Sequence, residues 1–214
     1  MRTTSYRLAM LAILTALPHH AIAAAAIGEP IGTVTILLGS VSVQFVDNGG
    51  TAPLALKDTI REGETVRTGS GARLRLALRD GSTLTLGENA ELRLDHLALR
   101  GRADDRPSLF TQLRGYLHAV IASVRPNARF EVQTSSMVAA VRGTHWIQRY
   151  DSGTTEIFVE QGQVQASGTG DRVDDRVLLQ AGEGVSFIAN APHTPVVRWG
   201  QQKIDLFVAA TRVP

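Results

Sequence analysis

The feature that most constrains this chain is a strict alternation of polar and apolar residues that stops at glycines. Residues 73–79 read Arg-Leu-Arg-Leu-Ala-Leu-Arg, and a period of two places the leucines on one face of a β-strand. Asp80-Gly81 follows and predicts a two-residue hairpin turn, since both residues tolerate positive φ. The alternation returns at residues 83–86 and again at 91–94. These segments predict a meander of short amphipathic strands.

The alternation also changes phase at two glycines, Gly39 and Gly162, in a shared pattern of apolar-x-x-Gly-x-Val. Such a change exchanges the two faces of a strand and indicates a tight turn or a bulge. Each copy precedes a second shared pattern, at residues 60–66 and 179–185. We therefore expect an all-β fold of short antiparallel strands with a weak internal duplication. A sandwich, a jelly roll and a rolled sheet remain open.

Helical patterns are scarce. Residues 95–100 have room for one helical turn, and residues 203–211 suit either a short helix or a last strand. Pro192 and Pro195 are expected to end the compact region, which leaves residues 191–214 as a tail of uncertain structure.

The N-terminus has the layout of a secretory signal peptide. Two arginines precede ten largely apolar residues, 8–17, and Ala21-Ile22-Ala23 supplies small residues for cleavage. Ten residues rise only about 15 Å as a helix, half of a bilayer core. We expect a signal peptide at 1–23, a linker at 24–30 and a β domain at 31–190. The mature chain is then expected in the periplasm or another extracytoplasmic space, without a transmembrane segment.

Export changes the charge of the chain. The full sequence has 22 basic and 20 acidic residues, and two of the basic ones, Arg2 and Arg7, belong to the expected signal peptide. The mature chain would then have 20 of each sign and a formal charge of zero. A neutral chain gives no electrostatic reason to expect nucleic acid as a partner.

Four short motifs, in order, resemble the FecR-type periplasmic domain. They are Glu-x-Val-Arg-Thr-Gly at 64–69, Asp-Gly-Ser at 80–82, Val-Arg-Gly-Thr at 141–144 and Ala-Gly-Glu at 181–183. The resemblance extends over roughly residues 31–190. It implies an all-β extracytoplasmic module. In the founding regulators this module lies beyond a membrane helix and relays the state of an outer-membrane receptor to a sigma factor. This sequence shows no such helix, so we do not expect the relay itself.

Residues near the third motif are the candidate contacts for a protein in the cell envelope. The motif residues themselves are expected to shape turns. The candidate partner-binding residues are Arg142, His145, Trp146, Arg149 and Tyr150. The expected structural signature is Gly63, Thr68, Gly69, Gly81, Gly143, Thr144, Gly182 and Glu183.

Arginines 73, 75, 79 and 93 are expected to share one sheet face, with Arg67 nearby. A solvated face with interspersed glutamates is the preferred interpretation, and an anion-binding patch is the alternative.

Catalytic motifs and cysteines are absent from the sequence, and the histidines lack the spacing of metal ligands. We therefore expect no enzyme, no cofactor and no metal; a small-molecule ligand is left open. The leading hypothesis is an exported binding module that contacts its partner by strand addition at a sheet edge or through a loop face. The alternatives are a membrane-anchored regulator with an uncleaved N-terminus and, ranked last, an envelope enzyme whose residues meet only in space.

Overall fold

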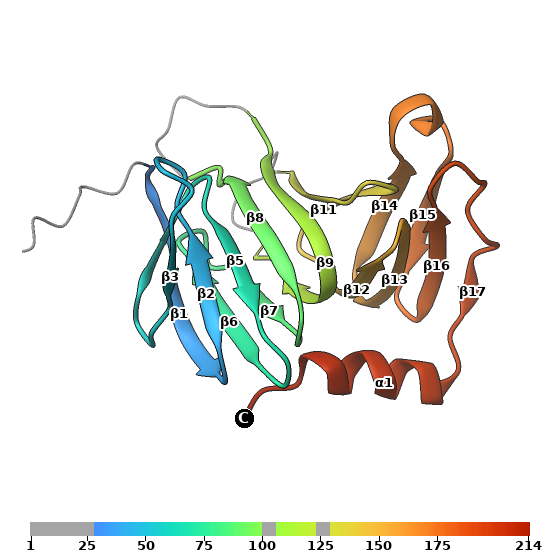
Figure 1. The fold of residues 1–214 in the computed structure, drawn as a ribbon. Coiled ribbons are helices and arrows are strands. Elements are labelled where there is room, and N and C mark those ends of the chain that lie inside the picture. Colours follow the sequence, from blue (N-terminus) through green and yellow to red (C-terminus); the bar gives the residue numbers. More distant parts are fainter. Residues whose placement is uncertain (1–27, 100–105, 123–128) are drawn as a thin grey trace, which may run out of the picture.

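The computed structural model describes residues 28–99, 106–122 and 129–214 (Figure 1). The all-β prediction is confirmed, because the described chain consists mostly of strands with one α-helix and one short 3-10 turn. The strands form two layers that share a single long strand, β9 (Ser108–Val120). Most neighbouring strands are antiparallel, as expected, and β9 and β10 are a parallel pair.

Layer A contains nine strands joined by hydrogen-bonded pairing through the second half of β9. In spatial order they are β4 (Thr59–Arg61), β1 (Pro30–Leu38), β6 (Arg73–Leu78), β7 (Thr83–Leu86), β9, β12 (His145–Asp151), β13 (Thr154–Gln161), β16 (Glu183–Ile188) and β17 (Val197–Arg198).

Layer B is built in the same way through the first half of β9. Its order is β3 (Thr51–Pro53), β2 (Val41–Gln44), β5 (Thr65–Thr68), β8 (Glu91–His96), β9, β10 (Phe130–Gln133), β11 (Met137–Val141), β14 (Gln163–Gly168) and β15 (Arg176–Gln180). A 3-10 turn, η1 (Gly170–Arg172), lies between β14 and β15.

The strand β9 passes from layer B to layer A at Gly115. Residues up to Arg114 pair with β8, and residues from Gly115 onward pair with β12. Gly115 has φ +86°, and a Cβ there would lie 2.5 Å from Cα of Ala90. The bend therefore requires glycine both for its backbone angle and for the close approach of β8.

The two phase changes are tight turns, as one of the two alternatives predicted, and each turn is a corner between the layers. Gly39 (φ +71°) separates β1 in layer A from β2 in layer B, and Gly162 (φ +84°) separates β13 from β14 in the same sense. A threonine-glycine motif lies against each corner. The Gly69 N–H donates to the Ser40 carbonyl at 2.9 Å, and the Thr144 hydroxyl donates to the Gln163 carbonyl at 2.8 Å.

The second shared pattern, at residues 60–66 and 179–185, forms the same turn twice, but the two turns cross between the layers in opposite directions. Gly63 and Gly182 both have φ +87°. In each turn a glutamate carboxylate accepts the N–H three residues before it, from Arg61 to Glu64 and from Gln180 to Glu183, both at 2.8 Å. The first turn leads from layer A to layer B, from β4 to β5, whereas the second leads from β15 in layer B to β16 in layer A. The duplication is therefore local and does not extend to strand pairing.

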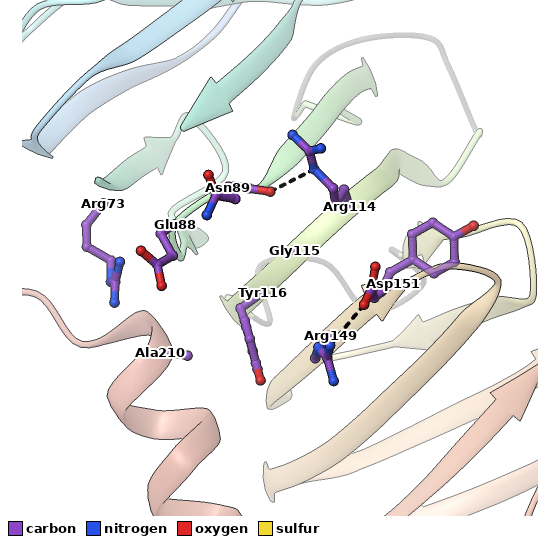
Figure 2. Close-up of a pocket in the computed structure, with 10 residues that line it drawn as sticks. Arg73, Glu88, Asn89, Arg114, Gly115, Tyr116, Arg149, Asp151 and Ala210 are labelled. Carbon is purple, nitrogen blue, oxygen red and sulfur yellow. Dashed lines mark hydrogen bonds and ion pairs between the residues drawn. The ribbon is translucent and has the colours of Figure 1, made fainter. Parts of the chain in front are cut away.

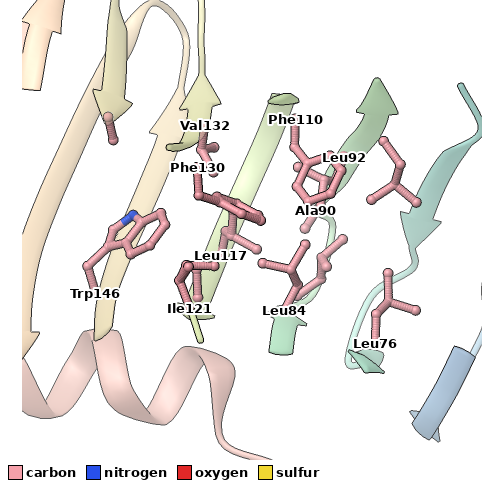
Figure 3. Close-up of a cluster of buried hydrophobic side chains, with 14 of the residues drawn as sticks. Leu76, Leu84, Ala90, Leu92, Phe110, Leu117, Ile121, Phe130, Val132 and Trp146 are labelled. Carbon is pink, nitrogen blue, oxygen red and sulfur yellow. The ribbon is translucent and has the colours of Figure 1, made fainter. Parts of the chain in front are cut away.

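One apolar core fills the space between the layers along the whole sandwich. Leu76, Leu84 and Leu92 contribute from the N-terminal half, and Phe130 and Trp146 from the C-terminal half (Figure 3). Phe110 and Phe130 meet edge to face with ring centroids 5.0 Å apart. Burial of these alternating apolar faces provides the main driving force for folding.

The predicted meander over residues 73–94 is wrong in its last step. Strands β6 and β7 do form a hairpin in layer A, but β8 pairs with β5 and β9 in layer B. The hairpin also has a three-residue loop, because the Gly81 N–H donates to Leu78 and only Gly81 has positive φ.

The compact chain continues past Pro195. Residues 201–211 are helical, as one of the two alternatives predicted, and form α1 (Gln201–Thr211). Phe207 is 1% exposed and meets Trp199 and Tyr116 edge to face. Figure 1 shows α1 running beneath the sandwich, from the C-terminal half back towards the N-terminal half. Its packing partners lie on β9 and β12, so α1 covers part of the outer face of layer A.

Candidate partner-binding surfaces

The five predicted contact residues do not form one surface. Arg142 is exposed in the turn before β12, and His145 is half-buried at the start of that strand. Arg149 and Tyr150 lie at its other end. Since neighbouring residues of a strand point to opposite faces, β12 divides the set between the outer surface and the core.

Trp146 belongs to the core and is not available as a surface contact. Its side chain is fully buried, and its indole N–H donates to Oε1 of Gln148 at 2.8 Å. The Gln148 amide then donates to Gln112, and the Gln112 amide donates to the Gly115 carbonyl, both at 2.6 Å. This buried chain of hydrogen bonds connects β12 to the bend of β9. Sequence reasoning missed it because Gln112 and Gln148 are 36 residues apart.

The predicted signature residues lie at turns and corners. Besides the glycines described above, the Thr68 hydroxyl donates to the Gly87 carbonyl at 2.6 Å and accepts from the Ala90 N–H at 2.9 Å. Gly143 has φ +59° in the turn that contains Arg142. These residues contact the protein's own backbone, so they stabilise turns and corners of the fold.

Arg149 and Tyr150 line a cavity of about 260 Å³ beside the bend of β9 (Figure 2). Tyr116 and the C-terminal end of α1, at Ala210, complete its wall. Arg149 is paired with Asp151 at 3.0 Å and Glu156 at 3.5 Å, and the Tyr150 hydroxyl lies 2.6 Å from Oγ of Ser135. Burial raises the pKa of Tyr116, so its hydroxyl stays protonated at neutral pH.

His145 belongs to a second polar cluster, on the outer face of layer A. Nε2 of His118 lies 2.8 Å from the Glu160 carboxylate. This close contact with His118, together with the charges of His118 and His145, lowers the pKa of Glu160 despite the opposing effect of burial. The described residues include no group of three or more His, Asp or Glu side chains placed to hold a metal ion.

The strand β15 is an edge of layer B, with β14 as its only strand partner among the described residues. The Gly168 N–H donates to the Asp175 carbonyl, so the backbone groups of 175, 177 and 179 face β14. The backbone groups of Arg176 and Leu178 therefore point away from the sheet. Leu178 is 56% exposed, which makes this edge both unpaired and partly apolar.

The predicted shared face of the arginines is wrong. Arg67 and Arg93 lie on layer B, where they pair with Glu91 at 2.7 Å and with Asp95. Arg73 and Arg75 lie on the outer face of β6 in layer A, and Arg79 follows in the hairpin loop. The alternation within each strand was predicted correctly, but it does not specify which layer a strand joins.

Within the described ranges, no helix combines the length and the apolar composition that crossing a bilayer requires.

Comparison with known proteins finds a family match over part of the chain. Residues 64–165 match the FecR protein family. No curated protein matches the chain. Two crystal structures of a "putative anti-sigma factor" from Parabacteroides distasonis have a similar fold, each with a TM-score of 0.54 over 67% of this chain. Their identities are 14% and 15%, so the similarity concerns the fold alone. The matched region spans less than two thirds of those proteins, at 64% and 63% of their length. The chain described here carries a FecR-family domain, at residues 64–165.

Proposed function

We propose that this chain is an exported, non-enzymatic binding module that recognises a protein partner in the cell envelope. Its FecR domain supports a role in signalling or regulation. The fold similarity to a "putative anti-sigma factor" supports the same class of role, because regulators of that kind act by binding proteins. Export rests on the signal-peptide layout of the first 23 residues.

The observation that carries the binding mode is the free edge of β15. An extended segment of a partner can add to such an edge through backbone hydrogen bonds, while side-chain contacts determine specificity. The backbone groups of Arg176 and Leu178 supply the hydrogen bonds here. The Gln180 N–H is already bound by Glu183 at 2.8 Å, so the available edge ends at the Gln180 carbonyl.

The test is capture of an envelope protein by the mature chain, with one matched pair of variants. Leu178→Lys places a charge on the edge, and Leu56→Lys places the same charge at a loop leucine that is equally exposed, at 56%. Capture should be lost with Leu178→Lys and kept with Leu56→Lys. Equal capture by both variants would reject the β15 edge, and a robust hydrolase activity or a stoichiometric metal would reject the binding module.

The alternative function is a membrane-anchored regulator of a sigma-type relay, favoured by the fold similarity to the "putative anti-sigma factor". It requires an uncleaved N-terminus. Mass spectrometry of the mature protein separates the two functions: a chain that begins near Ala24 supports the exported module, and a chain that begins at Met1 in the membrane fraction supports the anchored regulator.

A further inference from the structure

A row of arginines on the outer face of β6 differs from the other arginine-rich regions of the molecule. Arg73 and Arg75 point outward from β6, and Arg79 follows in the same alternation. Within the described ranges none of the three lies within ion-pair distance of a carboxylate. The positive charge of this row, which we call the β6 arginine face, is therefore not locally neutralised.

Elsewhere in the described chain six arginines are paired with a carboxylate, whereas Arg61, Arg114, Arg142, Arg198 and Arg212 lie singly on other elements without an ion pair to a described residue. The pairs are Arg67–Glu91, Arg93–Asp95, Arg129–Glu131, Arg149–Asp151, Arg172–Asp175 and Arg176–Asp174. The chain uses more arginine than lysine throughout, but this general excess does not explain why arginines on other elements form ion pairs and those on β6 do not. What distinguishes β6 is that three unpaired arginines follow one another on one strand and its hairpin loop, which gives this face a net positive field.

The hydrogen bonds of the β6 arginine face go to neutral acceptors. Nε of Arg75 donates to the Thr85 hydroxyl at 3.2 Å, and Nη1 of Arg79 donates to the Pro30 carbonyl at 2.9 Å. Nη1 of Arg73 donates to the Ala72 carbonyl at 2.8 Å, while its Nε is buried without a hydrogen-bond partner among the described residues. These contacts orient the guanidinium groups and leave their charge available to an anion.

Two carboxylates lie near the ends of this face, Asp80 in the hairpin loop after Arg79 and Glu88 beside Arg73. Glu88 lines the same cavity as Arg73 (Figure 2), and its carboxylate accepts the Gly71 N–H at 2.7 Å. Counting both Glu88 and Asp80 against the three arginines still leaves a positive surplus on the face. The helix α1 packs mainly on β9 and β12, and its C-terminal end, at Ala210, reaches the cavity that Arg73 lines (Figure 2).

The geometry favours an extended polypeptide as the occupant. Alternate residues of a strand repeat at about 6.8 Å, so the backbone positions of Arg73 and Arg75 on β6 repeat at the interval of alternate side chains in another extended chain. The cross-strand neighbours on this face are Thr33 and Thr83 beside Ala77, Thr85 and the half-buried Ile36 beside Arg75, and Leu38 beside Arg73. Leu38, at 39% exposed, is the one large apolar side chain among them that is more than a third exposed, so a lipid surface would gain little apolar burial there.

We propose that the β6 arginine face binds an acidic, extended segment of a protein partner. The proposal rests on the proposed function, and it adds a second contact surface on the layer opposite to the β15 edge. Arg73, Arg75 and Arg79 would form charge-assisted hydrogen bonds with aspartate or glutamate side chains. Such a surface accelerates association and makes binding sensitive to salt.

The test uses a fluorescein-labelled oligoglutamate peptide and two triple variants of the mature chain. One carries Arg73→Gln, Arg75→Gln and Arg79→Gln; the matched control carries Arg67→Gln, Arg93→Gln and Arg129→Gln, which removes the same charge from paired positions. Fluorescence anisotropy should show affinity weakened about tenfold in the first variant and by less than about twofold in the control. The salt dependence of binding should also fall only in the first variant.

Equal weakening in the two variants would overturn the proposal, since it would indicate binding to net charge alone. The proposal would also be overturned if the protein sedimented with phosphatidylglycerol vesicles but did not bind the peptide, since the face would then bind a membrane surface. Leu178→Lys should leave peptide binding unchanged. The two proposals can fail separately. If Leu178→Lys keeps partner capture and the β6 triple variant still loses peptide binding, binding at the β15 edge is rejected and binding at the β6 arginine face is supported.

Discussion

Gly63 and Gly182 show how one residue type can have the same conformation and different surroundings. Both have φ +87°, which costs an L-residue about 1–2 kcal/mol. A Cβ at Gly63 would lie 2.7 Å from Cγ2 of Val46, whereas at Gly182 it would approach only the mobile end of Arg198, at 3.3 Å. Gly63→Ala should therefore destabilise the protein more than Gly182→Ala in urea unfolding. Equal losses would show that backbone strain alone determines the cost.

Glu160 predicts a pH dependence at the residue scale. Its pKa is lowered in the folded protein by His118, so the ionised carboxylate stabilises the fold above the ordinary glutamate pKa of 4.5, and this contribution disappears as the pH falls through the lowered value. The stability difference between wild type and Glu160→Gln should shrink when the pH is lowered through this range. Thermal unfolding across pH measures it. His118→Gln should reduce the same pH dependence, and a difference independent of pH would contradict the assignment.

Residue-level prediction succeeded where the chemistry is local. The sequence pattern identified Gly63, Gly182 and Glu183 as turn residues, and the structure gives them matching turns. It could not show that Trp146 is buried, because the tryptophan lies next to polar residues and its partner Gln148 is held by Gln112, which is distant in sequence.

At the scale of elements, the bend of β9 connects the two halves of the sandwich. Gly115→Ala would combine positive φ with a contact of 2.5 Å to the Ala90 backbone. We expect a loss of about 2 kcal/mol or more, measured by denaturant unfolding. Gly71→Ala is the control, since Gly71 has φ +67° but no neighbour within 4 Å of the added Cβ. Similar losses in both variants would show that the close packing of β8 on β9 has no energetic role.

The helix α1 has no side-chain cap at its N-terminus and is only 11 residues long, so packing must stabilise it. Phe207→Ala removes its buried anchor and should cost about 3–5 kcal/mol. Trp199 fluorescence should change in parallel, because the two rings are 4.7 Å apart. Leu206→Ala, at a residue 60% exposed, is the control. Loss of stability without a change at Trp199 would contradict docking of α1 through this pair.

Strand positions were predictable because alternation is a local signal, and it also indicated a tight turn or a bulge at Gly39 and at Gly162. Layer membership was not predictable. β6 and β8 have the same alternating pattern, yet they lie in opposite layers because their partners, β1 and β5, are fixed by long-range pairing. The arginines were assigned to one face for this reason.

At the scale of the whole molecule, the resemblance to the FecR family was recognisable from four short motifs, and the match at residues 64–165 covers the first three completely. The surfaces available for binding could not be recognised from the sequence. An edge strand and an unneutralised face are properties of the assembled sandwich, since both depend on which strands have no neighbour and which charges have no partner.

Site-specific photo-crosslinking in intact cell envelopes tests the central claim of a protein-binding module most directly. A photoreactive amino acid is placed at Leu178 on the β15 edge or, as a control, at Leu56, which is equally exposed. We predict that position 178 yields one dominant protein adduct and that position 56 yields none of it. The same adducts from both positions, or no protein adduct from position 178, would contradict the account.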